Sequence, residues 1–181
     1  MGKADAPKHV FDTLATLKQA VITAKEVAEA VAAEKRRMQA EHDRIMAIKN
    51  VTERDASIVR MKVVDTIFTL RCPGENCGMA FLDFEGCFAL TCNNCRCGFC
   101  AWCLKDCGRD AHAHVPHCPE GKNGDVYGSK KEFDDHHRGR KAQGVRALLR
   151  DKEGDVRDRA LQLLQKDLED LGIAVEEVEV R

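Results

Sequence analysis

The sequence predicts a mainly α-helical protein in which a small cysteine-rich module lies between helical arms. Apolar residues recur every three or four positions over residues 10–45, 53–68 and 129–171, which is the spacing of one helix face. Between these stretches, residues 72–118 contain all ten cysteines. The composition agrees with this fold class, because 33% charged and only 5% aromatic residues are typical of long helices rather than of a large globular core.

Three parts follow from this organisation: a helical, coiled-coil-like arm over residues 1–70, the module over residues 71–118, and a loop with two helices over residues 119–181. The chain has no apolar run of about 18 residues and no apolar segment of secretory type near its start, so no membrane-spanning helix or signal peptide is predicted. We therefore expect the protein in the cytoplasm or nucleus. A net charge of −1 gives no overall attraction to membranes or nucleic acids, so the expected partners are proteins.

The N-terminal arm carries the seam of a heptad repeat. Seam residues step by fours and threes from Val10 to Ile45. The basic run Lys35–Arg37 is interpreted as a solvated face, and His42 as a polar residue of the seam rather than a metal ligand. The cysteine-rich module is too small to cover the whole apolar seam of this helix. Self-association through this helix, or another protein partner, is therefore expected.

The heptad pattern falters near Asn50. Thr52 followed by an acid resembles a helix start. A second helix is predicted over residues 53–68, with Ile58, Met61, Val64 and either Ile67 or Phe68 turned inward. The two segments are compatible with an antiparallel helical hairpin or with one continuous helix in a homodimeric coiled coil.

The module contains cysteine pairs at the spacings of metal-binding knuckles. Without an export signal the cysteines are expected in a reducing compartment, where such clusters bind metal more often than they form disulfides. Zn²⁺ is the default metal because it takes four nitrogen or sulfur ligands in a tetrahedron. Two zinc ions are predicted, the first held by Cys72, Cys77, Cys92 and Cys95, and the second by Cys100, Cys103, His114 and Cys118.

The second ligand set leaves alternatives open. His114 is preferred because its four-residue step to Cys118 is common in zinc fingers, but His112, Cys107 and Cys97 are rivals. Residues 79–84 and 87–91 flank Glu85-Gly86, which predicts a short β-hairpin. Cys87 has no close pairing partner and is either a small buried hydrophobic residue or a nucleophilic thiol.

The C-terminal part begins with a glycine-containing loop. Ser129 and Glu132 form a capping box that predicts a helix to about Arg150, with His136 and His137 on its surface. A further helix is predicted over residues 155–171, ended by Gly172, and the tail over residues 173–180 is expected to form a short strand. The stripe of this helix is formed by Val156, Ala160, Leu164, Leu168 and Leu171.

The run GCFALTCNNCRCGFCAWCL, preceded by CPGENC, resembles the second RING domain of the RING-between-RING ubiquitin ligases. The five-residue step from Cys72 to Cys77 is closer to the related in-between-RING module. The resemblance covers about residues 70–118 and implies a zinc architecture. It also implies that Cys87 stands where those ligases accept ubiquitin as a thioester from a conjugating enzyme, which would make ubiquitin and that enzyme partners.

Two functions compete at this point. The first is a zinc-binding protein-interaction or scaffold protein, and the alternative is a ubiquitin-protein transferase with Cys87 as acceptor. In the ligases a histidine two residues after the acceptor helps the transfer, but here that position is Ala89, and the chain contains no first RING. These differences favour the scaffold, and they leave open whether the chain is an enzyme.

Overall fold

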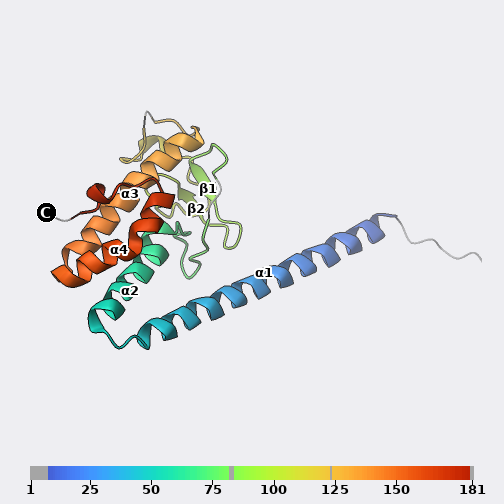
Figure 1. Cartoon of the computed structure of the whole chain (residues 1–181). Helices are drawn as coiled ribbons and strands as arrows, with labels where there is room; N and C mark the ends of the chain where they lie inside the picture. The colour runs from blue at the N-terminus through green and yellow to red at the C-terminus, as the bar shows by residue number, and fades with distance from the viewer. Residues whose placement is uncertain (1–7, 82–83, 123, 180–181) are drawn as a thin grey trace, which may run out of the picture. The chain divides into compact units, whose positions relative to one another are not determined.

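The computed structural model describes residues 8–81, 84–122 and 124–179, with side chains from residue 24 onward. It forms two units, residues 1–49 and 50–181, and each is considered by itself. The first contains the helix α1 (Lys8–Met46), and the second contains the helices α2 (Val51–Val63), α3 (Lys130–Arg150) and α4 (Gly154–Asp170) together with the cysteine-rich module (Figure 1). The predicted mainly helical class with a small β element is confirmed for the described residues.

The helix α1 presents apolar seam residues to its surface. Val31 is 41% exposed and Met38 is 42% exposed, while His42 is exposed as well. Pairs such as Glu34 with Arg37 lie on the same surface and contribute little to stability, because exposed ion pairs are screened by water. The earlier seam positions, Val10, Leu14, Leu17 and Val21, have side chains outside the described part of the chain.

The helix α1 ends at Met46, and Asn50 is the N-cap of α2. Its side-chain oxygen accepts a hydrogen bond from the backbone N–H of Glu53 at 2.9 Å, which satisfies one of the free donors of the first turn. The predicted start at Thr52 was therefore wrong by two residues. The buried face of α2 is formed by Ala56, Val59 and Val63. Of the residues predicted to face inward, Ile58, Met61 and Val64 are only partly buried, whereas Ile67 and Phe68 pack partly against the helical core. A π-helical turn over Val64–Phe68 follows.

The helical core of the second unit joins α2 and α4 with part of α3. The predicted stripe of α4 is confirmed: Ala160, Leu164 and Leu168 are fully buried, with Val156 and Leu171 packed partly against them. Ion pairs connect α2 to α4 at two positions, Glu53 to Arg159 and Arg60 to Asp167. Gly172 ends α4 with a positive φ of 64°, as predicted from its position.

The tail after α4 is not a strand. Val175–Glu177 forms a 3-10 turn, and Ile173 and Val178 are buried in the helical core on either side of it. Apolar residues five apart cannot share the face of one strand, and here a turn brings both of them inward. Among the described residues, no helix is long and apolar enough to cross a membrane.

The β element is a two-stranded antiparallel sheet formed by β1 (Ala89–Thr91) and β2 (Gly98–Cys100), with Leu90 opposite Phe99. The predicted hairpin about Gly86 is therefore wrong in its pairing, although part of its first strand, Leu82 and Asp83, lies outside the described residues. The segment around Gly86 forms backbone hydrogen bonds with residues 126–128 instead. The turn between β1 and β2 is the knuckle that carries Cys92 and Cys95.

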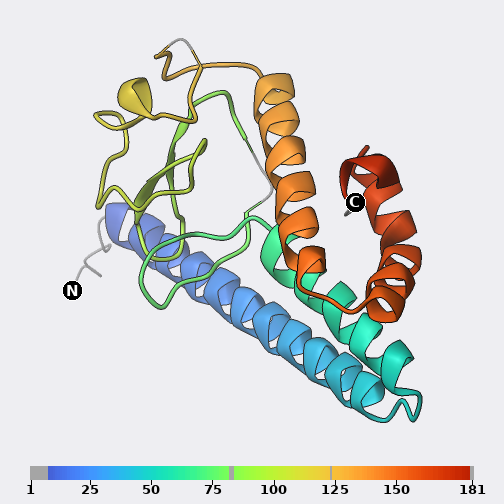
Figure 2. The same cartoon turned by 90° about the vertical axis from the view of Figure 1, so that its left-hand side faces the viewer.

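The helix α3 begins with the predicted capping box of Ser129 and Glu132, and it packs against the module (Figure 2). Its Phe133 joins a buried aromatic cluster with Phe84, Phe88 and Trp102. The rings of Phe84 and Phe133 stack with their centroids 4.7 Å apart. The rings of Phe88 and Trp102 stack with their centroids 3.8 Å apart. Aromatic side chains therefore connect the module to the helical part of the chain.

The adjacent histidines of α3 are not surface residues, in contrast to their predicted location. His137 is only 2% exposed, and its Nε2 lies 2.7 Å from the carbonyl oxygen of Ala101. His136 Nε2 lies 2.8 Å from the carbonyl oxygen of Trp102. Both imidazoles hydrogen-bond to carbonyls of the turn after β2, and the Trp102 carbonyl also accepts a hydrogen bond from the Arg140 guanidinium at 3.1 Å.

His137 gives the folded protein a sensitivity to acid. Burial lowers the pKa of His137 to about 4 from its ordinary value of 6.5. Between these two values the unfolded chain binds more protons than the folded one, so the free energy of unfolding falls as the pH falls. The stability that the neutral, buried His137 imidazole contributes is fully present at pH 7. Below pH 6.5 the free energy of unfolding falls by at most about 1.4 kcal/mol per pH unit because of this group.

Urea unfolding of the wild type and of His137→Gln at pH 7 and at pH 5 measures this contribution. Glutamine keeps a donor for the Ala101 carbonyl but does not titrate. We expect the wild type to lose more stability between the two pH values than the variant, and protonation of the cysteines affects both proteins alike. Equal losses in the two proteins would show that His137 is not the acid-sensitive group.

Candidate metal centres

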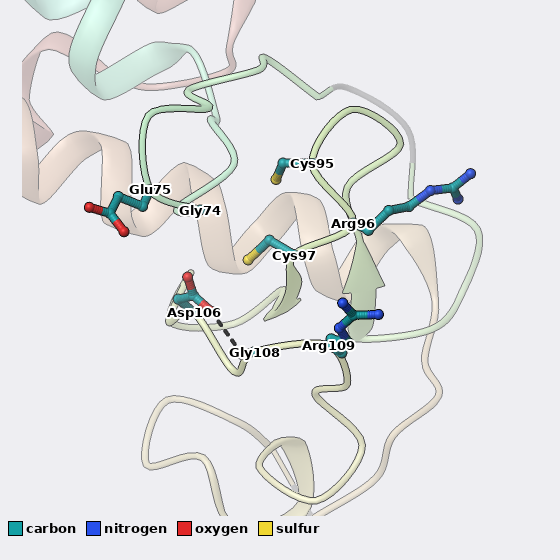
Figure 3. Close-up of a pocket in the computed structure, with 8 residues that line it drawn as sticks. All are labelled: Gly74, Glu75, Cys95, Arg96, Cys97, Asp106, Gly108 and Arg109. Atoms are coloured by element: carbon teal, nitrogen blue, oxygen red, sulfur yellow. Dashed lines mark hydrogen bonds between the residues drawn. The ribbon is translucent and has the colours of Figure 1, made fainter.

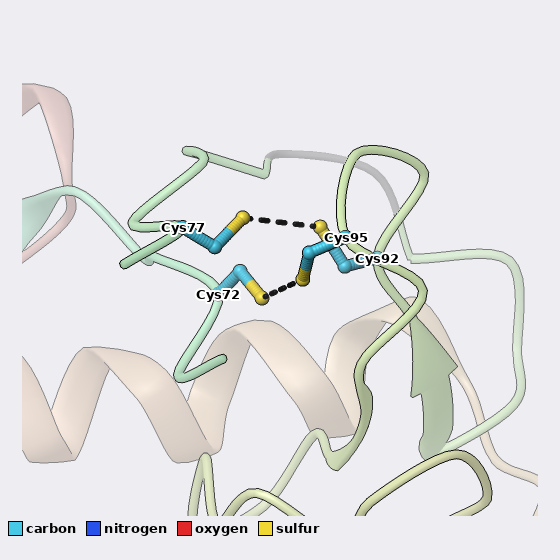
Figure 4. A group of neighbouring side chains, drawn as sticks. All are labelled: Cys72, Cys77, Cys92 and Cys95. Carbon is cyan, nitrogen blue, oxygen red and sulfur yellow. Dashed lines mark hydrogen bonds between the residues drawn. The ribbon is translucent and has the colours of Figure 1, made fainter. Parts of the chain in front are cut away.

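The first predicted set of cysteines converges on one point. Cys72 and Cys77 come from the segment after α2, and Cys92 and Cys95 come from the turn between β1 and β2 (Figure 4). The Sγ atoms of Cys72 and Cys95 are 3.6 Å apart, and those of Cys77 and Cys92 are 3.7 Å apart. Four sulfurs about 2.3 Å from a zinc ion in tetrahedral geometry would be about 3.8 Å apart, so this cluster fits such an ion.

Local backbone geometry points these sulfurs toward one another. The amide of Cys77 donates to the carbonyl of Gly74, and the amide of Cys92 donates to the carbonyl of Cys97, which closes the two knuckles. A side chain at Gly74 would place its Cβ 2.9 Å from the Sγ of Cys95, so only glycine fits there. Arg96 in the second knuckle has a φ of 62°, a conformation that tight turns around metal ligands require.

The second predicted set also converges. Cys100 is the last residue of β2, and Cys103 lies in the turn that follows it. His114 and Cys118 flank a 3-10 turn over Val115–His117. The ligand atoms of these four residues lie within 4.8 Å of one another, and Cys103 Sγ is 3.4 Å from His114 Nε2. Val115, the first residue of this turn, is buried in the aromatic cluster of the module and fixes the turn against it.

The protonation of the cysteines depends on their surroundings. Burial raises the pKa of the Cys100 thiol to about 12, and burial also raises the pKa of Cys72. Cys77 differs, because the side-chain amide of Asn94 donates to its sulfur and lowers its pKa to about 6. The Cys72 and Cys100 thiols are therefore neutral without a cation, and a bound metal ion would release their protons.

The rival ligands lie outside both clusters. Cys97 is buried with its Sγ 3.6 Å from the carbonyl oxygen of Gly98, and burial raises the pKa of its thiol to about 11. Cys107 lies with its Sγ 3.4 Å from the carbonyl oxygen of Lys105. His112 contacts Cys87 rather than the second cluster. The structure thus places His114, and not these residues, beside Cys103.

A contact that sequence reasoning missed joins Cys87 to His112. The Sγ of Cys87 is 3.8 Å from Nε2 of His112, and Nδ1 of the same imidazole is 2.6 Å from a carboxylate oxygen of Asp110. The only sequence signal was the spacing of Asp110 and His112, which does not indicate a cysteine more than twenty positions away. One imidazole thus contacts a thiol through one ring nitrogen and a carboxylate through the other.

A hollow of about 490 Å³ opens beside the first cluster (Figure 3). Cys95 and Cys97 line one side of it, and Arg96, Arg109 and Asp106 bring charges of both signs. The carboxylate of Asp106 accepts a hydrogen bond from the amide of Gly108 at 2.8 Å, which holds the loop on the rim. Residues of the first cluster and residues of the loop that leads to the second both line the hollow.

Comparisons of this chain with protein-family models, with curated proteins and with solved structures found no match.

Proposed function

We propose that this chain is a zinc-binding protein-interaction protein, in which two zinc ions fix a small module against a helical body. The observation that carries this proposal is the convergence of two sets of four sulfur and nitrogen donors. Each set is complete with four protein ligands, which is the arrangement of structural rather than catalytic zinc. Thiolate with imidazole is a donor set that selects zinc over hard cations such as magnesium or calcium.

The proposed role in protein interaction rests on the resemblance of the module to known zinc modules and on the exposed apolar residues of α1. The resemblance of residues 70–118 to the zinc modules of RING-between-RING ligases suggests a recognition module. The helix α1 offers apolar seam residues such as Val31 and Met38 at its surface, which favours binding of a further helix. The simplest such partner is a second copy of α1, because the heptad spacing from Val10 to Ile45 is that of a coiled coil.

Ubiquitin transfer is a second candidate function. The observation that favours it is the contact between Cys87 and His112, which places an imidazole beside the thiol where the local sequence has only Ala89. Incubation with a ubiquitin-charged conjugating enzyme tests this candidate. A ubiquitin adduct that is lost on thiol reduction and absent in Cys87→Ala would support it, and the absence of an adduct across a panel of conjugating enzymes would contradict it.

The zinc content of the purified full chain tests the two centres. We expect two zinc ions per chain, and one ion in Cys77→Ser and in Cys103→Ser, because each variant breaks a different cluster. Cys107→Ser and His112→Gln are matched controls that should keep both ions. A metal measurement by mass spectrometry distinguishes these cases, and loss of an ion from either control would show that the assigned ligand set is wrong.

Removal of the metal should affect the two parts of the chain differently. Structural zinc sites contribute on the order of 10 kcal/mol to the folding of small modules. A chelator should therefore unfold residues 72–118, while much of the helical circular dichroism persists. Unchanged nuclear magnetic resonance signals from the module after complete metal removal would contradict a structural role for the ions.

Self-association through α1 can be measured by sedimentation equilibrium of the zinc-loaded chain. We expect a dimer at micromolar concentrations that Val31→Glu converts to monomer, because the variant places a charge in the apolar seam. Ala33→Glu adds the same charge outside the seam and should leave the dimer intact. A wild-type chain that stays monomeric at high concentration would exclude the second copy as partner.

A further inference from the structure

A second hollow, which we call the basic groove, lies between α3 and the segment that follows α2. Its volume is about 420 Å³, which is within the range of sites that bind small molecules. One wall is a single face of α3, because residues three and four positions apart lie on the same side of a helix. That wall is formed by His137, Arg140, Lys141 and Gly144, and the opposite wall by residues from 66–73 together with Leu104.

Local backbone geometry fixes the shape of the basic groove. The π-helical turn Val64–Phe68 is closed by the amide of Thr69, which donates to the carbonyl of Val64 at 3.1 Å. Ile67 of this turn packs over Gly144, where a Cβ would lie 3.0 Å from a methyl carbon of Ile67. Single π-helical turns are frequent at functional sites. The groove is therefore formed where an uncommon turn meets a helix at close range.

The charged residues that line the basic groove are all basic, namely Arg71, Arg140 and Lys141. The charge of Arg71 is already balanced, because its guanidinium forms an ion pair with Asp65. The guanidinium of Arg140 lies 3.9 Å from a carboxylate oxygen of Glu120, so its charge is balanced in part. The charge of Lys141 is therefore the one that a ligand would meet.

Lys141 forms no ion pair within the described part of the chain. The other two lysines of α3 differ, because each pairs with an aspartate one turn further along the helix, at 2.9 Å and 2.6 Å. The side chain of Lys141 is partly buried, and burial lowers the pKa of its amino group. The ammonium ion has thus lost part of its hydration without a close partner in return, and an anion in the groove would stabilise it.

The remaining lining of the basic groove is largely apolar. Ile67, Leu70 and Leu104 line it, and each of them is only partly buried by the rest of the protein. The hydroxyls of Thr66 and Thr69 already donate to backbone carbonyls, at 2.8 Å in both cases, so they offer no free donor. A matching ligand therefore has one anionic group and a short apolar body that covers these side chains.

Charge compensation of the first metal cluster is the competing interpretation, because Cys72 also lines the groove. Four thiolates around one zinc ion carry a net negative charge, which a nearby cation would stabilise. The sulfurs of that cluster have donors of their own, however: the amide of Gly74 donates to Cys72 at 3.3 Å, and the side chain of Asn94 donates to Cys77 at 3.4 Å. Among the described residues, Lys141 forms no hydrogen bond to these sulfurs.

We propose that the basic groove binds a small organic carboxylate, with the carboxylate paired to Lys141 and the apolar body against Ile67 and Leu104. One unpaired cation matches the single charge of a carboxylate better than the larger charge of a phosphate monoester. The inference goes beyond the proposed role in protein interaction, because it assigns a small-molecule ligand to a part of the fold outside the metal centres.

A titration of the zinc-loaded full chain with hexanoate, followed by amide chemical shifts in nuclear magnetic resonance, tests this proposal. We expect saturable shift changes that are largest in residues 66–73 and 137–144. Acetate should bind at least about tenfold more weakly, because it lacks the aliphatic chain that covers the apolar wall. Hexylammonium has the same chain but a charge of the same sign as Lys141, so it should not bind.

Variants of Lys141 test the ion pair. Lys141→Gln should weaken the binding of hexanoate by at least about tenfold, because the carboxylate loses its charged partner. Lys141→Arg keeps the positive charge and should retain most of the binding. Lys166→Gln is the matched control and should bind as the wild type does, since Lys166 is an exposed lysine of α4 that does not line the groove.

Three results would overturn the proposal: unchanged affinity for hexanoate in Lys141→Gln, equal binding of hexylammonium and hexanoate, or tighter binding of hexyl phosphate than of hexanoate. The zinc content of every variant is measured in parallel. Loss of one zinc ion from Lys141→Gln would show that this lysine compensates the charge of the first cluster, and it would likewise contradict the assignment of Lys141 to a ligand.

Discussion

The cysteine-rich module depends on bringing eight donor atoms into two tight groups, and this constraint explains most of its local structure. Sulfur atoms about 3.6 Å apart, several of them buried, gain little from one another without a cation. Among the described residues of the module, regular secondary structure is limited to two strands of three residues each and one 3-10 turn. The knuckles with positive φ and the close packing at Gly74 are then consequences of ligand geometry rather than of a conventional core. We infer that the metal ions and the aromatic cluster together replace that core.

The helix α3 packs against both the helical body and the module. Its buried Phe133 enters the aromatic cluster of the module, while its Val145 and Leu149 enter the core formed with α2 and α4. The turn that carries Cys103 exposes carbonyls to the inside of the protein, and the two histidines of α3 contact them. The turn that carries Cys103 is thus coupled to α3 through these hydrogen bonds.

Sequence patterns identified features whose causes are local. The ligand pairs follow from spacings of three to five residues, the capping box of α3 from Ser129 and Glu132, and the stripe of α4 from a helical period. The predictions failed where a distant segment decided the outcome. The sequence predicted that the histidines of α3 lie on the surface, but they turn inward and hydrogen-bond to carbonyls more than thirty positions away. Gly86 indicated a hairpin, but the chain pairs instead with residues near Tyr127, which no short-range pattern can indicate.

The same distinction bears on Cys87. Along the chain, the residue two positions after the thiol is Ala89, whose side chain cannot act as a base. In space, His112 reaches the thiol from the loop that ends in the second metal cluster, two residues before His114. The position of the imidazole therefore depends on that cluster, since the turn at His114 and Cys118 holds the loop. The second cluster and the thiol are therefore parts of one connected structure: the turn that carries His114 and Cys118 holds the loop, and the loop places the His112 imidazole beside the Cys87 sulfur.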